Sequence, residues 1–238
     1  MSDLKVDGII ASTGTNTALT LQGKGSGKVD IGDGALSFPD ADGDANQVIK
    51  TDGSGALSFV TPAVAGWNII GTVVASDDAS LTITGLDSTY DTYAIGLSDM
   101  ECASNATPYL RVGDSGGVDS GASDYGYGVS GTSQAGAEES HGDTGASAIH
   151  LLSASTSTVS AAAGKGIGAM LFLHRPGDGT MQPCISGTVI PLWTSTSIYP
   201  LHVGGVRFSV ITLDRVQFLW STGNVKTGRM TVWGIAHA

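Results

Sequence analysis

A seven-residue motif occurs twice near the start of this chain. Residues 32–38 read GDGALSF, and residues 53–59 read GSGALSF, which differs at one position. Upstream, residues 5–9 (KVDGI) resemble residues 28–32 (KVDIG). A repeat of roughly 20 residues is one supersecondary unit used more than once, and such a unit cannot bury its apolar face alone. The repeat therefore predicts a segment that needs a partner surface or further copies of itself, as in an assembly protein.

The sequence divides near residue 63 into two regions of different character. Residues 1–63 hold short apolar runs between Gly and Asp turns, and we expect them to form an extended, hairpin-like stem that contact with a partner orders. The large apolar residues of the two motifs are the predicted buried anchors that attach the stem: Leu36, Phe38, Leu57 and Phe59. Residues 61–66 (TPAVAG) read as the linker.

Residues 64–238 carry many short segments with alternating or β-branched patterns and none with helical periodicity. They predict an all-β domain, a β-sandwich or jelly roll. Residues 130–148 and 153–164, rich in Gly, Ser and Ala, read as long surface loops. The expected strands are 67–75, 80–84, 92–100, 109–112, 125–129, 149–152, 167–173, 185–192, 201–208, 215–220 and 229–235.

The composition supports a β-rich chain and argues against partners that carry many phosphate groups. There are 35 glycines, which helices tolerate poorly and β-turns use freely. Acidic residues number 22 against 11 basic ones, and only 14% of residues are charged. Phosphate backbones are bound through Lys and Arg, so we expect no nucleic acid partner and no anionic membrane surface.

Two further features bear on the cellular setting. No opening segment has the charged and apolar regions of a secretory signal, and no apolar run reaches the length of a membrane helix. We therefore expect synthesis in the cytoplasm and no membrane insertion. The two cysteines, Cys102 and Cys184, make no disulfide framework and read as small buried residues, although the sequence leaves open whether they pair.

Motifs that hint at catalysis are incomplete. Residues 113–117 (GDSGG) spell a serine-protease motif, but no histidine precedes His141 to act as its base. Residues 23–28 (GKGSGK) lack the spacing of a phosphate loop. Asp40, Asp42 and Asp44 alternate like calcium ligands without completing an EF-hand, so either a bare turn or an incidental cation site is open. We expect no catalytic residues, no cofactor and no dedicated metal site.

Three aromatic residues in polar surroundings are candidate receptor contacts. Tyr125 and Tyr127 flank a glycine, and Trp193 precedes a Ser/Thr run. Such rings can stack on sugars while neighbouring hydroxyls bond the rim. They can equally pack the sandwich or a subunit interface.

The chain resembles tailed-bacteriophage virion proteins of the tail-fibre kind. The opening LKVDGI with TGT and LTL (residues 4–21) is similar to their N-terminal start, and residues 27–40 and 47–55 are similar to their stem unit. The C-terminal region is similar to a phage jelly-roll module at residues 86–93, 119–125, 216–225 and 233–235.

This resemblance implies a homotrimeric protein of the virion surface, assembled in the host cytoplasm, with no catalytic residues to carry over. The stem of about 60 residues reaches at most ~200 Å even if fully extended, which is short for a fibre. We therefore favour a capsid decoration or cement protein bound to the major capsid protein. The alternatives are a tail-fibre receptor-binding protein that joins tail proteins and contacts host surface glycans, a carbohydrate-binding module, and a depolymerase with two converging acids.

Overall fold

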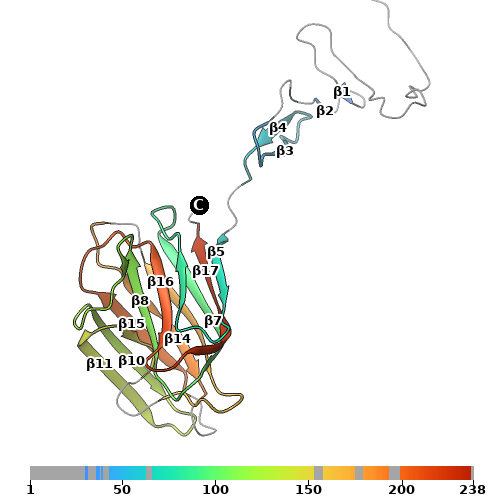
Figure 1. Cartoon of the computed structure of the whole chain (residues 1–238). Helices are drawn as coiled ribbons and strands as arrows, with labels where there is room; N and C mark the ends of the chain where they lie inside the picture. The colour runs from blue at the N-terminus through green and yellow to red at the C-terminus, as the bar shows by residue number, and fades with distance from the viewer. Residues whose placement is uncertain are drawn as a thin grey trace, which may run out of the picture. The chain divides into compact units, whose positions relative to one another are not determined.

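The computed structural model describes residues 30–31, 36–37, 39, 43–62, 66–152, 158–174, 179–192 and 199–236. All regular structure in these ranges is β-strand, and every strand pairing is antiparallel (Figure 1). The prediction of an all-β chain is confirmed. The chain forms two compact units, Met1–Ala63 and Val64–Ala238.

The described residues of the first unit form two small hairpins that follow the sequence repeat. Strand β1 (Asp30–Ile31) pairs with β2 (Leu36–Ser37), and β3 (Val48–Thr51) pairs with β4 (Leu57–Val60). The second strand of each hairpin lies within one copy of the seven-residue motif, and residues 53–56 of the second copy also lie in the connection between β3 and β4. The repeat in sequence is therefore a repeat of the same supersecondary unit.

The turn between β3 and β4 is held by one carboxylate. Oδ1 of Asp52 accepts hydrogen bonds from the backbone N–H groups of Ser54 (2.7 Å) and Ala56 (3.0 Å). These bonds stabilise the charged form and lower the pKa of Asp52. Gly53 and Gly55 adopt positive φ angles of 80° and 95°, which suit glycine.

The second unit contains two sheets. The larger one has eight strands in the order β11-β10-β15-β14-β13-β7-β17-β5, and the smaller has the order β12-β8-β16-β6 with β9 beside β8. The strands of the larger sheet are β5 (Trp67–Val74), β7 (Thr92–Cys102), β10 (Tyr125–Thr132), β11 (Glu138–Ala146), β13 (Ile167–His174), β14 (Cys184–Pro191), β15 (Leu201–Arg207) and β17 (Val225–Ile235). Those of the smaller sheet are β6 (Leu81–Thr84), β8 (Pro108–Asp114), β9 (Gly117–Val118), β12 (Ile149–His150) and β16 (Arg215–Trp220).

Eight of these strands pair in a nested pattern. Strand β5 pairs with β17, β6 with β16, β7 with β13, and β8 with β12, so that the first strand meets the last and the middle two meet each other. Within this set β5, β7, β13 and β17 belong to the larger sheet, and the other four belong to the smaller. The remaining long strands, β10, β11, β14 and β15, extend the larger sheet beyond β13.

A single hydrophobic core joins the two sheets, an arrangement consistent with a β-sandwich. It takes Tyr93 and Leu171 from the larger sheet and Leu110 and Phe218 from the smaller, all of them fully buried. The burial pattern of β16 alternates strictly, as period-2 side-chain geometry requires for a strand with one buried face. In the part of the chain that the structure describes, every buried apolar side chain lies at Ala75 or later.

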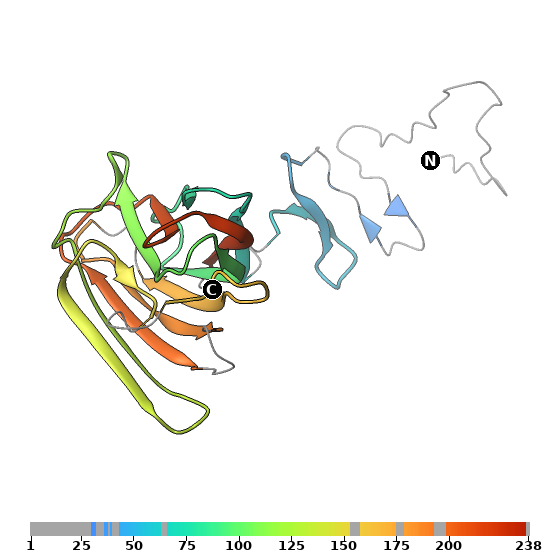
Figure 2. The same ribbon diagram turned by 60° about the horizontal axis from the view of Figure 1, so that its bottom comes forward.

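One segment predicted as a loop is a hairpin. Residues 130–148 were expected to be irregular, yet β10 and β11 run antiparallel through most of this range, and Figure 2 shows them as a long yellow-green ribbon. Strand β11 is a sheet edge whose residues are almost all exposed or half-buried. Because neither face of this strand is buried along its length, its sequence lacks the apolar alternation that would reveal it. The GDSGG motif, in contrast, lies at the tight turn between β8 and β9.

Candidate interaction surface

Tyr125, a predicted receptor contact, is a structural residue. It begins β10, where the sequence predicts a strand, and its side chain is fully buried. Its hydroxyl accepts a hydrogen bond from the Val112 N–H and reaches the carbonyl oxygens of Val112 and Asp119, all at 3.0 Å. Burial is the main cause that raises the pKa of Tyr125 to about 12. Of the two interpretations that the sequence left open for Tyr125, the structure therefore supports packing within the sandwich, in a strand that the sequence predicts at residues 125–129.

Replacement of Tyr125 by Phe tests this structural role. The variant keeps the ring but leaves the buried N–H of Val112 without the hydroxyl that accepts from it, so we expect a loss of about 1–3 kcal/mol in the free energy of unfolding. Denaturant unfolding of both proteins measures it. Because the Tyr125 side chain is fully buried and cannot touch a ligand, the folded variant should bind any ligand as the wild type does. An unchanged unfolding midpoint would contradict this role.

Tyr127 belongs to an aromatic stack that links three strands. Its side chain is buried, and its hydroxyl lies 2.7 Å from Nδ1 of His150 on β12. The His150 ring stacks between Tyr127 and Tyr109 of β8, with centroid separations of 4.4 and 4.3 Å. His141 of β11 lies 5.9 Å from the Tyr127 ring. The structure thus also supports packing within the sandwich for Tyr127, in the strand expected at residues 125–129, and Trp193 lies outside the described residues.

The electrostatics of this stack favour neutral rings. Burial, with a smaller effect from His141, lowers the pKa of His150 to about 4, although the Asp143 carboxylate opposes the shift. Burial likewise raises the pKa of Tyr127 to about 12. At neutral pH the pair is therefore an uncharged, hydrogen-bonded link between the larger and the smaller sheet.

This link predicts a pH-dependent stability. In the unfolded chain His150 binds a proton near pH 6.5, but in the folded chain only near pH 4, so its contribution is complete above pH 6.5 and is lost as the pH falls toward 4. We expect a loss of about 1–2 kcal/mol, since solvent at this half-buried site reduces the full effect. Between pH 7 and 4, the free energy of unfolding should depend less steeply on pH in His150→Phe than in the wild type. The exposed control His202→Gln should keep the slope of the wild type. An equal slope in His150→Phe would contradict the assignment. Asp52, Asp87 and Asp214 titrate below this window because their pKa values are lowered.

The larger sheet exposes an apolar patch on the side away from the core. We call it the apolar face, and it comprises outward side chains of β5, β13 and β17: Trp67, Ile69, Met170, Phe172, Trp233 and Ile235. Three of them are well exposed: Ile69 to 69%, Trp67 to 48% and Met170 to 37%. Soluble proteins seldom expose contiguous apolar groups of this size without a use for them.

Aromatic rings and small residues shape this face. The Trp67 ring makes edge contacts with Trp233 and Phe172, at centroid distances of 5.9 and 6.4 Å. The Trp233 ring lies directly over Gly96 of β7, where an added Cβ would come within 2.8 Å of it. Gly96 and Ala94, which have small or no side chains, therefore let the large rings lie close to the sheet.

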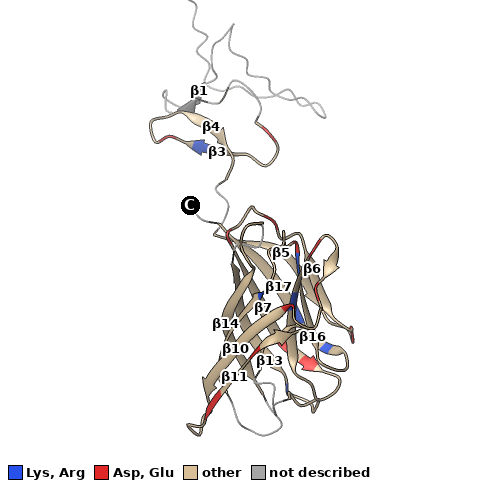
Figure 3. Cartoon of the chain, turned by 90° about the vertical axis from the view of Figure 1, so that its left-hand side faces the viewer, with Lys and Arg blue, Asp and Glu red and all other residues tan. Residues whose placement is uncertain are grey.

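The apolar face is free of acidic groups although the chain is acidic. Ile69, Trp233, Ala94 and Phe172 form one row of paired residues across β5, β17, β7 and β13. In this row and in the outward-facing rows next to it, the residues beside the six apolar ones are Thr, Gly, Ala and His. Figure 3 shows red on β11, which lies at the other edge of the sheet. The apolar face suits a neutral partner and not a charged one.

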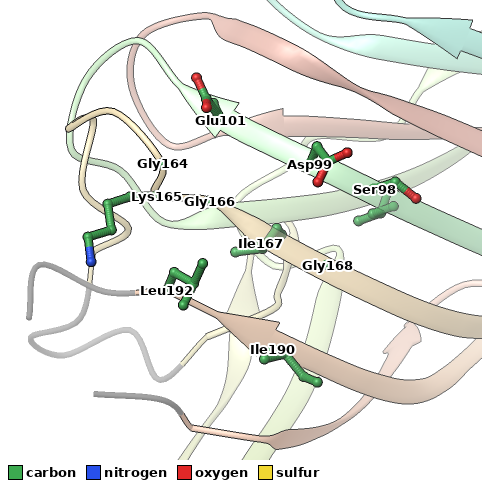
Figure 4. A pocket seen from close by; sticks show the side chains of 11 residues that line it. Ser98, Asp99, Glu101, Gly164, Lys165, Gly166, Ile167, Gly168, Ile190 and Leu192 are labelled. Atoms are coloured by element: carbon green, nitrogen blue, oxygen red, sulfur yellow. The ribbon is translucent and has the colours of Figure 1, made fainter. Parts of the chain in front are cut away.

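A pocket of about 510 Å³ adjoins the apolar face at the end of β7. Its apolar lining includes Ile167, Ile190 and Leu192, and Asp99 and Glu101 lie on β7 above them, as Figure 4 shows. The strand is irregular here, with Asp99 at a φ of 52°. Gly166 and Gly228 pack so closely on Met100 that an added Cβ would clash.

The described residues contain no group of three His, Cys, Asp or Glu side chains placed to hold a metal. Asp40 and Asp42 lie outside the described residues, and Asp44 is exposed. Both cysteines are free, with Cys102 buried and Cys184 exposed, so the expectation that both are buried is wrong for Cys184. No helix in the described ranges is long and apolar enough to span a membrane.

Comparisons with known proteins add no assignment. No family model, curated protein or solved structure matches this chain. A function for this chain is therefore inferred from its residues and from the geometry of the two units.

The sequence did contain a signal for the apolar face. Strand β5 (WNIIGTVV) and the end of β17 (RMTVWGI) have apolar residues at both alternating positions, although the two-sheet architecture buries only one side of them. Strands that are apolar on both sides are typical of sheets covered on both faces.

Proposed function

We propose that this protein is a non-enzymatic structural component of a tailed-phage virion, a homotrimeric surface knob that acts as a capsid decoration or cement protein. The observation that carries the proposal is the exposed, acid-free apolar face on an otherwise acidic all-β unit. A surface of this kind serves assembly with other subunits. The resemblance of the chain to phage virion proteins directs the proposal to that class of assembly.

The second unit, on this proposal, is a jelly roll. In a jelly roll eight strands wind as one folded ribbon, so that strand one pairs with eight, two with seven, three with six and four with five. The nested pairs β5–β17, β6–β16, β7–β13 and β8–β12 support this assignment. The hairpins β10–β11 and β14–β15 are then additions that widen one sheet.

The first unit is the proposed attachment to the major capsid protein. Two-stranded hairpins are marginally stable on their own, so a unit built from them gains from a partner surface. The β3–β4 hairpin leaves Val48 and Ile49 each 49% exposed. Leu57 and Phe59 of the proposed anchors are half-buried, and Phe38 and the side chain of Leu36 lie outside the described residues.

Reconstitution tests the proposed function. Particles of a phage deleted for this gene should bind the purified protein, which should co-sediment with them and saturate at a fixed number of copies per shell. If the protein acts as cement, the loaded particles should also resist heat better than the bare ones. Failure to bind intact particles at any concentration would contradict a role on the capsid.

A second candidate is a tail-fibre protein that contacts host glycans. A shallow groove of about 530 Å³ on the β10–β11 hairpin, lined by Ser130, Ser140 and His141 among others, favours it, since such side chains can bond sugar hydroxyls. Binding of the purified protein to a glycan array, lost on His141→Ala, would support this candidate.

A further inference from the structure

We infer that the apolar face is the contact between copies of this chain, and that it closes the homotrimer. The inference rests on the proposed homotrimer and adds where the subunits meet. Two features of the described strands support it: the two edges of the larger sheet differ in protection, and the apolar face carries no acidic side chain.

The edges of the larger sheet are unlike each other. Strand β11, at one end, carries Glu138, Glu139, His141 and Asp143, and charged residues protect an exposed edge from pairing with other chains. Strand β5, at the other end, carries no charged residue and no proline, and it exposes Trp67 and Ile69. An edge without such protection is expected to be covered, and the apolar face begins at this edge.

The distribution of charge on the chain favours a second copy as the partner at the apolar face. The chain has a net charge of −11, so two copies repel over most of their surfaces. The apolar face lacks acids, which makes it a side on which like copies can approach without direct repulsion. A basic partner would instead favour acidic surfaces elsewhere, whereas three copies arranged around a threefold axis bring acid-free apolar faces toward one another.

The apolar face lies next to the point where the N-terminal unit joins the second unit, which agrees with a threefold axis that runs past this face. Trp67 begins β5 directly after the linker, and the Ala236 N–H donates to the Gly66 carbonyl oxygen at 3.0 Å. Copies joined through this face hold the attachment points of their N-terminal units near one another. Each weak hairpin unit then acts at a high effective concentration, which favours simultaneous attachment to a capsid.

Light scattering on the full-length protein provides the first test. The wild type should have three times the 24.0 kDa mass of the chain at micromolar concentration. Ile69→Asp and Met170→Asp place a charge in the face without burying it in the monomer, and both should give monomers. The control Val210→Asp, at a site 47% exposed outside the face, should stay trimeric.

Oxidation of the wild type tests the same surface without a variant. Met170 and Met181 are 37% and 51% exposed in the single chain, so hydrogen peroxide should oxidise both at comparable rates if the face is free. Burial between copies should slow Met170 by at least about tenfold relative to Met181.

The outcomes separate the inference from the proposed function. A trimeric wild type whose Met170 oxidises as fast as Met181, or whose two face variants remain trimeric, overturns the inference and leaves the homotrimer standing. A monomeric wild type overturns both the inference and the proposed homotrimer.

Discussion

Removal of residues 1–63 should abolish binding to the particle while residues 64–238 stay folded. The division between the units falls at residue 63, and all buried apolar side chains of the described chain lie in the second unit. The truncated protein should therefore unfold with the same midpoint as the second unit in the full chain. It should also keep its oligomeric state, because the apolar face belongs to that unit. Sedimentation with particles that lack the protein measures the binding.

Point variants sharpen this prediction. Phe59→Asp changes one proposed anchor, and Ser58→Asp adds the same charge at the neighbouring exposed position of β4. We expect the Phe59 variant to lose particle binding by at least about tenfold, since a charge in an apolar contact costs more than a kilocalorie per mole. The Ser58 variant should bind nearly as the wild type does. Full binding by the truncated protein would show that attachment lies in residues 64–238.

Phe218→Ala should cause a large loss of stability in a chain that keeps its fold. Phe218 is fully buried in β16, a central strand of the smaller sheet, and packs edge-on against Trp220 at a centroid distance of 5.4 Å. The cavity left by removal of a buried Phe ring costs about 3–5 kcal/mol. For a unit of this size the melting temperature should fall by about 10 °C.

A matched exposed site provides the control for this substitution. Met181→Ala removes a side chain that is 51% exposed, so its effect on the free energy of unfolding should stay within about 0.5 kcal/mol. Denaturant unfolding at one fixed protein concentration compares the three proteins. A loss below about 1 kcal/mol for Phe218→Ala would mean that its ring is not enclosed by the two sheets.

Strands with one buried face were predictable from the sequence. Expected strands 215–220 and 167–173 correspond to β16 and β13, where buried and outward residues alternate and the sequence shows the period. The hairpin position of the seven-residue motif was also foreseeable, since the GSG turn demands the positive φ angles that Gly53 and Gly55 adopt.

Three features were not predictable because they depend on long-range pairing. Strand β11 has no buried face to pattern its sequence, so it resembles a loop. Tyr125 is enclosed by β8 and the 119–124 segment, which no local pattern reveals. The apolar face exists because Trp67 and Phe172, distant in sequence, lie on one side of one sheet. Its strands were recognised, but which of their two apolar sides meets the core follows only from the second sheet.

The number of copies per virion tests the central claim most directly. Quantitative mass spectrometry of purified particles compares the molar amount of this protein with that of the major capsid protein. A decoration protein predicts about one trimer per local threefold position of the shell, hence a ratio near one to one. A handful of trimers per particle would move the protein to the tail, and its absence from purified particles would contradict a structural role in the virion.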